Sequence, residues 1–434
     1  MHIPDLKSLP LIYRKLQALP LEQRLEAVSS GLASLADQGY YFYLQKIEDV
    51  QGARAWINGR EKLVLASYDY LGLMAHPEIK RAAMRAIEKY GTGTGGVRLL
   101  AGTFDLHERL ERRIAEFKGT EAAVVFSSGF MTNVAFFATL FGERDYLVVD
   151  KLCHASIIDG CRLAGGTLRV FQHNNVADLE VVLRAVRGEA TETSSIVVGV
   201  DAIYSMDGDI APLPEICRVA GQYGAKVLVD EAHALGVLGE TGRGIDEHFN
   251  VRGVDYFMGS LSKAIPSIGG YIAADGKTVE YLKHYARPFI FSSSLPPSAV
   301  ASALAAFDVM ETEGWRRTRL WRNQRALSEG LRAMGFDLLA SNSPIIPVVF
   351  RDPAMTLEFC RFLDDNGVFI CPILFPAVPL HASRLRGHVM ASHSEDDLEL
   401  CLDLFRKGRE LLGREPAAGA ALETERHGSD LDRL

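Results

Sequence analysis

The apolar run 227–229 ends in side chains that suit chemistry on a bound aromatic ring. Asp230 follows the run directly, and His233 lies three residues further on. A buried Asp requires a cationic partner, and in pyridoxal phosphate sites an Asp pairs with the protonated pyridine nitrogen and keeps the ring an electron sink. Since ligands of open α/β sheets bind at the carboxyl ends of the strands, we expect Asp230 to pair with such a ring and His233 to bond its phenolate oxygen. Taken alone, Asp230 is equally compatible with a core Asp that accepts backbone amides.

A lysine follows the next apolar run along the chain, within Ser260-Leu-Ser-Lys263. A Lys amine forms a Schiff base when desolvation lowers its pKa, and the hydroxyl groups of Ser260 and Ser262 suit phosphate oxygens. An isolated Lys beside a loop is usually an ordinary solvated side chain. Lys263 is therefore a candidate catalytic residue because of its neighbours rather than by itself.

Two turns further upstream complete the constellation. Ser128, Gly129 and Phe130 follow a strand and open a helix, where free backbone amides bind phosphate, although the pattern also fits a plain strand-to-helix turn. His154 likewise follows a strand and opens a helix, and it can stack on a pyridine ring, although a lone His more often caps a helix. The order of phosphate turn, stacking His, Asp-x-x-His and Ser-x-x-Lys is typical of fold-type I pyridoxal phosphate enzymes.

Alternating helices and short apolar runs surround these residues and predict an α/β domain. Runs of this kind are buried, mainly parallel strands, and we expect them at 122–126, 146–149, 168–171, 196–200, 226–229 and 256–258. The expected division is a helical arm over 1–60, a large α/β domain over 61–297, a small C-terminal α+β domain over 298–412 and a disordered tail over 413–434. Residues 298–334 are expected to form one long helical connection.

The composition excludes several classes of protein. The 434 residues carry a formal net charge of −8, which argues against nucleic-acid binding. The six cysteines include no C-x-x-C pair, so neither a disulfide framework nor a metal site is expected and the chain fits a reducing compartment. Because no continuous apolar segment suggests a secretory signal or a transmembrane helix, we expect a cytoplasmic protein, with contact at a membrane surface left open if its product is a lipid.

Two short motifs suggest other functions and are rejected on context. Residues 91–96 match G-x-G-x-x-G, but a helix precedes them where the dinucleotide fingerprint needs a strand. Residues 230–233 read Asp-Glu-Ala-His, as in a nucleotidase, but no G-x-x-x-x-G-K-[ST] loop lies upstream.

From about residue 40 to 412 the chain resembles the α-oxoamine synthases, a family of pyridoxal phosphate enzymes, and most closely the serine palmitoyltransferases. The resemblance implies a fold-type I transferase with a large, mixed but mainly parallel sheet domain and a smaller C-terminal domain. The matching motifs are Ser67-Tyr-Asp-Tyr-Leu-Gly-Leu73, Gly102-Thr-Phe-Asp-Leu-His107, His154-Ala-Ser-Ile-Ile-Asp-Gly160, Tyr204-Ser-Met-Asp-Gly-Asp209, Asp230-Glu-Ala-His-Ala-Leu-Gly236, Ser260-Leu-Ser-Lys263 and Phe291-Ser-Ser-Ser-Leu-Pro-Pro297.

The resemblance also assigns roles at the cofactor. Lys263 forms the Schiff base and later moves the α-proton of the substrate, Asp230 pairs with the pyridine nitrogen, and His154 stacks on the ring and can polarise a carbonyl. The residues expected to contact the cofactor are Ser128, Gly129, Phe130, His154, Ser205, Asp230, His233, Ser260, Lys263 and, reaching into the neighbouring subunit's site, Ser292 and Ser293. The resemblance therefore implies a homodimer with shared active sites.

Arg386 falls where the family clamps the amino acid carboxylate, which suits the geometry of a guanidinium fork. Thr94 and Asp69 are expected near the same substrate. Asp69 stands where family members usually have Asn, and a second carboxylate there would repel the substrate unless it is protonated or turned away.

The implied reaction is a decarboxylative Claisen condensation, in which an amino acid and an acyl thioester, carried by CoA or by an acyl carrier protein, give an α-amino ketone. The segment from Ser262 to Gly270 is most like the serine palmitoyltransferase version, which favours L-serine with a fatty acyl thioester and a place in sphingolipid biosynthesis. The alternative is a glycine- or alanine-using member of the 8-amino-7-oxononanoate synthase or 2-amino-3-ketobutyrate CoA ligase type. A pyridoxal phosphate aminotransferase is the more distant alternative.

Overall fold

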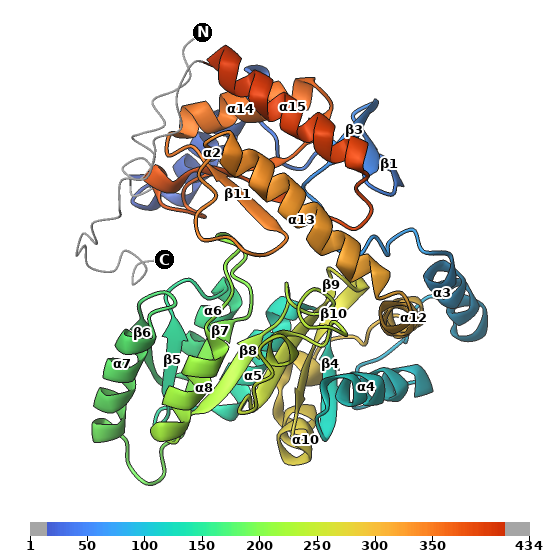
Figure 1. The fold of residues 1–434 in the computed structure, drawn as a ribbon. Coiled ribbons are helices and arrows are strands. Elements are labelled where there is room, and N and C mark those ends of the chain that lie inside the picture. Colours follow the sequence, from blue (N-terminus) through green and yellow to red (C-terminus); the bar gives the residue numbers. More distant parts are fainter. Residues whose placement is uncertain (1–14, 413–434) are drawn as a thin grey trace.

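The computed structural model describes residues 15–412, and a seven-stranded sheet lies at its centre (Figure 1). β10 pairs antiparallel with both of its neighbours, β4 and β9, while the remaining pairs in the sheet are parallel. All the other strands of the sheet therefore run in one direction. In spatial order the strands are β4 (Ala122–Phe126), β10 (Pro266–Ala274), β9 (Tyr256–Ser262), β8 (Lys226–Asp230), β7 (Ile196–Asp201), β5 (Tyr146–Asp150) and β6 (Thr167–Phe171).

Both faces of this sheet are covered, which explains why its strands are continuous apolar runs. Along β8, Val227 and Val229 belong to one buried cluster, whereas Leu228 between them belongs to the other. Successive side chains of a strand point to opposite faces, so the two clusters are the two faces of one sheet. A parallel sheet covered on both sides is the arrangement expected for alternating strands and helices.

Helices cover the central sheet and connect it to two smaller sheets, of which the first is antiparallel with the order β11 (Ile345–Val349), β14 (Arg384–His388) and β13 (Cys371–Ile373). The second has the order β1 (Ile47–Gln51), β2 (Arg54–Ile57), β3 (Arg60–Val64) and β12 (Val368–Phe369). The helices are α2 (Leu21–Asp37), α3 (Pro77–Tyr90), α4 (Asp105–Lys118), α5 (Gly129–Leu140), α6 (Ala155–Ala164), α7 (Val176–Glu189), α8 (Leu213–Gln222), α9 (Ile245–Phe249), α10 (Gly276–Tyr285), α11 (Arg287–Ile290), α12 (Pro297–Thr312), α13 (Trp315–Ala333), α14 (Pro353–Asp365) and α15 (Glu395–Leu412), with a short 3-10 turn at Leu380–Ala382.

The structure differs from the sequence-based expectations in three places. Residues 47–64 form strands rather than part of a helical arm, and β12 pairs with β3, so this N-terminal segment shares a sheet with the C-terminal part of the chain. The connection over 298–334 is two helices, because α12 ends at Thr312 and α13 begins at Trp315. β10 was not expected. The division into domains stays a prediction, and the expected tail over 413–434 lies outside the described residues.

Within residues 15–412, the helices include none with the length and apolar character needed to cross a membrane.

Candidate active site

The parallel strands of the central sheet bring several polar side chains to one edge. β5, β7 and β8 end in Asp150, Asp201 and Asp230, and the last two are direct partners in the strand register. β9 continues through Ser260 to Ser262, immediately before Lys263. The carboxyl ends of parallel strands lie side by side, so the expected Asp and Lys do share one edge of the sheet.

Asp230 is fixed from both sides by hydrogen-bond donors. Its Oδ2 accepts from the amide of Asn133 at 2.7 Å, and its Oδ1 accepts from the backbone N–H of Ala232 at 2.9 Å. Asn133 also donates to Ser156 at 2.9 Å, and the Ser156 hydroxyl lies 2.7 Å from Nδ1 of His154. A continuous chain of hydrogen bonds therefore connects Asp230 to His154.

His154 caps the N-terminus of α6, as a lone His often does. Its Nδ1 accepts from the backbone N–H of Ser156, and the backbone N–H of His154 donates to the Asp201 carboxylate at 3.2 Å. The surrounding protein lowers the pKa of its imidazole, and the nearby positive charge of Lys263 acts in the same direction. The side chain stays exposed, which leaves its ring available to a ligand at the sheet edge.

Burial and neighbouring charged groups together set the pKa of the Lys263 amine. Burial lowers the pKa of Lys263 to about 8, and the carboxylates of Asp230 and Asp201 limit the fall. Asp201 is itself buried, and burial together with the charge of Asp230 raises its pKa well above the ordinary value. A lysine with this pKa is uncharged in a useful fraction of molecules near neutral pH, as a nucleophilic amine must be.

The turn after β4 forms a close-packed cradle beside β9 and β10. Ser128 caps α5 by accepting from the N–H of Met131 at 3.2 Å. A Cβ on Gly270 would lie 2.8 Å from Cα of Gly129, so Gly270 leaves no space for a side chain, and Gly129 lies beside the Ser260 side chain. The first amides of α5, at Gly129 and Phe130, have no partner within the helix, which is a geometry suited to a phosphate group.

His233 is held in a neutral state by its surroundings. Its Nδ1 lies 2.8 Å from the hydroxyl of Tyr70. Burial raises the pKa of Tyr70 and lowers the pKa of His233 well below its usual value, and Lys263 adds to the second effect. Tyr70 therefore keeps its proton and donates it to Nδ1, which leaves Nε2 of His233 as an N–H donor.

Arg386 reaches the site from β14 and connects three segments. Its Nη1 donates to the carbonyl of Ser205 at 3.0 Å, and its Nη2 donates to the hydroxyl of Tyr68 at 2.7 Å. The ring of Tyr68 also lies 5.8 Å from Nζ of Lys263. Ser205, Arg386 and Lys263 therefore meet around Tyr68.

Asp69 and Thr94 are engaged with backbone groups. The two oxygens of Asp69 accept from the N–H groups of Leu73 at 2.7 Å and Met74 at 3.2 Å. Burial raises the pKa of Asp69, and these two N–H groups oppose the rise. The Asp69 carboxylate therefore points back to the turn over residues 69–74, where it fixes the backbone. The hydroxyl of Thr94 donates to the carbonyl of Gly96 at 3.2 Å.

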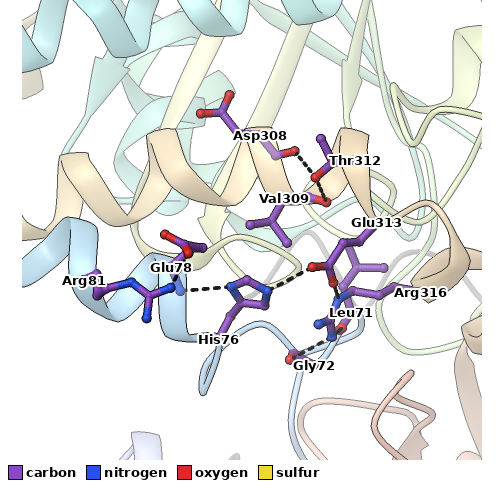
Figure 2. Close-up of polar contacts among 10 residues, drawn as sticks. All are labelled: Leu71, Gly72, His76, Glu78, Arg81, Asp308, Val309, Thr312, Glu313 and Arg316. Atoms are coloured by element: carbon purple, nitrogen blue, oxygen red, sulfur yellow. Dashed lines mark hydrogen bonds and ion pairs between the residues drawn. The ribbon is translucent and has the colours of Figure 1, made fainter.

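The Asp69 turn is held from outside by the junction of α12 and α13 (Figure 2). Arg316 donates from Nη1 to the carbonyls of Leu71 and Gly72 at 3.0 and 3.3 Å. Its Nε pairs with Glu313 at 2.7 Å, and the other oxygen of Glu313 lies 3.2 Å from Nε2 of His76. One cluster of charged side chains therefore joins the turn to the start of α13.

Ser292 and Ser293 lie on the segment between α11 and α12. Ser293 bridges to Val97, and both serines line a small cavity together with Ser127 and Arg98. Their expected contact with the phosphate of a neighbouring subunit concerns a second chain and stays a prediction.

Asn133, Ser156, Tyr68 and Tyr70 also contact the site, and none of them was expected from the sequence. Asn133 had the clearest signal, because it is a fully buried amide on a mainly apolar helix, one turn after the phosphate cradle. An unexplained polar residue on a buried helix face was the signal available in the sequence. Ser156 carried a weaker signal, since a Ser beside a helix cap is common.

The arrangement fits a phosphorylated pyridine aldehyde. Asp230, with its oxygens fixed, suits a protonated ring nitrogen, and the amine of Lys263 suits an aldehyde. The amides at Gly129 and Phe130 suit a phosphate, while Nε2 of His233 is a donor for a ring oxygen. These residues would hold pyridoxal phosphate.

Comparisons with known proteins agree with this chemistry. The family model for aminotransferases of class I and II matches residues 60–405. An 8-amino-7-oxononanoate synthase of Thermoanaerobacter pseudethanolicus is 42% identical over 389 residues, which are 89% of this chain and 98% of the relative. A serine palmitoyltransferase of Bacteriovorax stolpii is 39% identical over 378 residues, which are 87% of this chain and 89% of the relative.

Solved structures give the same grouping. A serine palmitoyltransferase with its pyridoxal phosphate internal aldimine matches with a TM-score of 0.87 at 35% identity, over 91% of this chain and 100% of the other. An 8-amino-7-oxononanoate synthase of Francisella tularensis matches with a TM-score of 0.70 at 26% identity, over 81% of this chain and 99% of the other.

Proposed function

The chain belongs to the class I and II aminotransferase family and, within it, to the pyridoxal phosphate-dependent α-oxoamine synthases, and from this we propose that it joins glycine or L-alanine to an acyl thioester, as an enzyme of the 8-amino-7-oxononanoate synthase type. The enzyme is an acyltransferase, and the open question is which amino acid and which acyl group it takes. The observation that carries the proposal is the set of relatives of this type, which reach 42% identity over nearly their whole length.

A serine palmitoyltransferase activity is the second candidate. It is supported by the segment from Ser262 to Gly270, and by the higher TM-score with a serine palmitoyltransferase, 0.87 against 0.70. The identities of the two kinds of relative, 42% and 39%, differ by little. The relatives nevertheless favour glycine or L-alanine over the L-serine that the sequence motifs favoured.

The proposed reaction forms one carbon–carbon bond and releases two products. The α-carbon of the amino acid bonds to the thioester carbonyl carbon, the carbon–sulfur bond breaks and a thiol leaves. The α-carboxylate leaves as CO₂, and a proton returns to the carbon. Pyridoxal phosphate, when bound, supplies a protonated pyridine ring that takes up the negative charge left on the α-carbon.

The residues of this chain prepare that chemistry. Asp230, fixed by Asn133, provides the negative charge that keeps a ring nitrogen protonated. The amine of Lys263, with a pKa of about 8, accepts the α-proton and later returns it. His154 lies at the exposed side of the same edge, where its imidazole can bond the thioester carbonyl and polarise it.

Arg386 is proposed to bind the carboxylate of the amino acid. Its guanidinium already reaches the centre of the site, where it donates to the carbonyl of Ser205 and to the hydroxyl of Tyr68. A carboxylate can replace these neutral acceptors with charge-assisted hydrogen bonds, which are stronger.

We also propose a homodimer that shares its active sites. Three large apolar side chains are exposed in the single chain: Leu100 is 82% exposed, Phe291 is 73% exposed, and Phe130, in the turn expected to bind phosphate, is 44% exposed. Exposed apolar patches mark interaction surfaces. Phe291 directly precedes Ser292 and Ser293, so burial of this segment against a second copy would bring those serines to the neighbouring site.

Product analysis tests the proposed function. The purified enzyme is supplied with an acyl-CoA and with glycine, L-alanine or L-serine in turn, and CO₂, free thiol and amino ketone are measured. We expect one CO₂ and one thiol for each amino ketone, with glycine or L-alanine as the best substrate. A preference for L-serine would support the second candidate, and a keto acid formed without CO₂ would contradict both.

A further inference from the structure

His388, which was not among the expected site residues, packs against the ring of Tyr68, whose hydroxyl accepts a hydrogen bond from Arg386. Arg384, Arg386 and His388 alternate along β14 and therefore project from the same face of the strand. His388 is only 2% exposed, and its ring meets the ring of Tyr68 edge to face, with centroids 4.7 Å apart and planes at 77°. Tyr68 thus has His388 against its ring and Arg386 on its hydroxyl.

The hydrogen bonding of His388 is unlike that of His393, a second buried histidine in the same part of the chain. Among the described residues, neither ring nitrogen of His388 has a hydrogen-bond partner. His393, which is fully buried five residues later, bonds with both nitrogens, to the N–H of Met390 at 3.1 Å and to the carbonyl of Val64 at 3.0 Å. His393 is therefore anchored by hydrogen bonds, whereas His388 acts on its surroundings through the contacts of its ring.

The position of Tyr68 determines how Arg386 is presented. The hydroxyl of Tyr68 lies 2.7 Å from Nη2 of Arg386, and the same ring contacts His233 edge to face at 5.6 Å between centroids. Movement of the Tyr68 ring would release the guanidinium from its present direction. The ring of His388 blocks one such movement, because it occupies the space beside Tyr68 on the β14 side.

We propose that His388 is a positioning residue: its ring holds Tyr68 against Arg386 and so sets the affinity of the enzyme for the amino acid carboxylate. This inference rests on the proposed function, since it takes Arg386 as the group that binds the carboxylate. His388 itself touches no substrate in this account. Its imidazole is neutral, because burial and the neighbouring Arg386 lower its pKa well below the usual value, so it adds no charge to the site.

The test is a titration of the holoenzyme with L-alanine, followed by the change in the visible absorption band of the cofactor. We expect His388→Ala to raise the dissociation constant of L-alanine about two- to tenfold, which is the effect of losing one edge-to-face aromatic contact. The kcat at saturating L-alanine is expected to stay within about twofold, because the reacting groups are untouched. Tyr68→Phe, which removes the hydroxyl that Arg386 bonds, should weaken binding similarly, and His388→Ala should then have no further effect.

Two further variants distinguish an effect of His388 on L-alanine binding from an effect on protein stability. His388→Phe keeps the ring and removes the two unpaired nitrogens, so we expect wild-type affinity for L-alanine and equal or higher thermal stability. His393→Phe leaves the N–H of Met390 and the carbonyl of Val64 without partners, so it should lower stability and leave the affinity for L-alanine unchanged.

The affinities of the variants for L-alanine test the role of His388 separately from the carboxylate role of Arg386. If His388→Ala binds L-alanine with wild-type affinity while Arg386→Lys binds it more weakly, the role of His388 is overturned and the proposed function is retained. Loss of binding in His388→Phe also overturns it, because the ring nitrogens would then be the active groups. Arg386→Lys with wild-type affinity contradicts the carboxylate role of Arg386 in the proposed function itself.

Discussion

Asn133 connects Asp230 to His154 through hydrogen bonds. Its amide donates to Asp230 at 2.7 Å and to Ser156 at 2.9 Å, and Ser156 continues to His154. The direction of the Asp230 carboxylate and the orientation of the His154 ring are therefore coupled through one buried side chain. A hydrogen bond to a charged group is worth about 1.5–3 kcal/mol, so this coupling is large enough to affect cofactor binding.

We expect Asn133→Leu to weaken the binding of pyridoxal phosphate by about ten- to a hundredfold, which corresponds to the loss of one charge-assisted hydrogen bond. Titration of the apoenzyme with pyridoxal phosphate measures the effect. Asn323→Leu is the matched control, since Asn323 is a buried amide that donates to the carbonyls of Met390 and His393. The control should lower stability and bind the cofactor normally, and equal affinities for the two variants would contradict the account.

The amine of Lys263 should capture the cofactor at a lower pH than a free lysine does. Because burial lowers its pKa to about 8 from 10.5, half of the amine is uncharged at about pH 8, and the uncharged fraction is nearly complete above about pH 9. The rate of reconstitution of the apoenzyme, followed by the visible absorption band between pH 6 and 10, is expected to reach half of its maximum near pH 8 and to level off above about pH 9. A rate that keeps rising in proportion to hydroxide beyond pH 9 would rule out the lowered pKa.

At this scale, sequence motifs predicted where the Asp, His and Lys of the candidate site lie, but no motif pointed to the side chains that contact them. Asp230, His233 and Lys263 follow strands in recognisable patterns, and the structure brings them to one edge. Asn133 lies 97 residues from Asp230 in the chain, and that separation has no sequence signature. For Asp69 the sequence left protonation and a turned-away carboxylate as alternatives, and the structure shows that the carboxylate accepts from two backbone N–H groups of its own turn.

At the scale of elements, the junction of α12 and α13 supports the turn that carries Tyr68 and Tyr70. Arg316, with its side chain 15% exposed, joins Glu313 to the carbonyls of Leu71 and Gly72 (Figure 2). The expectation of a long helical connection over 298–334 did not locate the break between the two helices. Gly314 at the break was a signal for an interrupted helix.

Arg316→Ala should lower the free energy of unfolding by about 1–3 kcal/mol, because it removes hydrogen bonds from a half-buried charged group. Urea unfolding monitored by circular dichroism measures the change. Arg322→Ala on the same helix is the control, since Arg322 is 55% exposed and its ion pair with Glu395 spans 3.4 Å. The control should change stability by less than about 0.5 kcal/mol, and similar losses in both variants would argue against a supporting role of the junction.

His173 joins the ends of β5 and β6 to the 207–209 segment that follows β7. It lies 2.9 Å from Asp150 and 2.8 Å from Asp209, and although burial lowers the pKa of His173, these two hydrogen bonds raise it to about 10. The raised pKa means that its stabilising effect is complete below its ordinary pKa of 6.5 and is lost as pH rises through about 10.

Comparison of wild type with His173→Gln tests this pH dependence. The difference in their free energies of unfolding should be largest at pH 6 and should shrink steadily toward pH 10, as measured by urea unfolding at several pH values. A difference that does not change between pH 6 and 10 would show that the charge of His173 contributes nothing.

β10 has a physical reason for being missed in the sequence. It contains two adjacent glycines, at 269 and 270, and a Cβ on Gly270 would collide with the backbone of Gly129. Glycine normally weakens a strand, so sequence patterns exclude such a segment, while close packing against the phosphate cradle requires it. The continuous apolar runs of β4 to β8 lack this conflict and were predicted correctly.

At the scale of the whole molecule, the site depends on parts that are distant in the sequence. Asp230 ends β8 and Lys263 directly follows β9, both strands of the central sheet, whereas Tyr68 lies in the segment after β3 and Arg386 lies on β14. The large apolar side chains of Leu100 and Phe291 are exposed in the single chain, and the proposed homodimer would bury them.

Phe291→Asp is expected to convert the dimer into a monomer and to remove most of the activity, because it places a charge in an apolar interface. Sedimentation equilibrium measures the mass, and the product assay measures activity in the same sample. Val181→Asp, at a 60% exposed site on α7, is the control and should leave both unchanged. A Phe291→Asp variant that stays dimeric would contradict the proposed interface.

The most direct test of the account is the visible absorption spectrum of the purified enzyme with pyridoxal phosphate, recorded for wild type and for Lys263→Ala. The account predicts a visible band in the wild type that shifts on addition of glycine or L-alanine, and no such band in folded Lys263→Ala before an amino acid is added. A wild-type enzyme without the band, or a Lys263→Ala variant that retains it, would contradict the assignment of Lys263 as the residue that holds the cofactor.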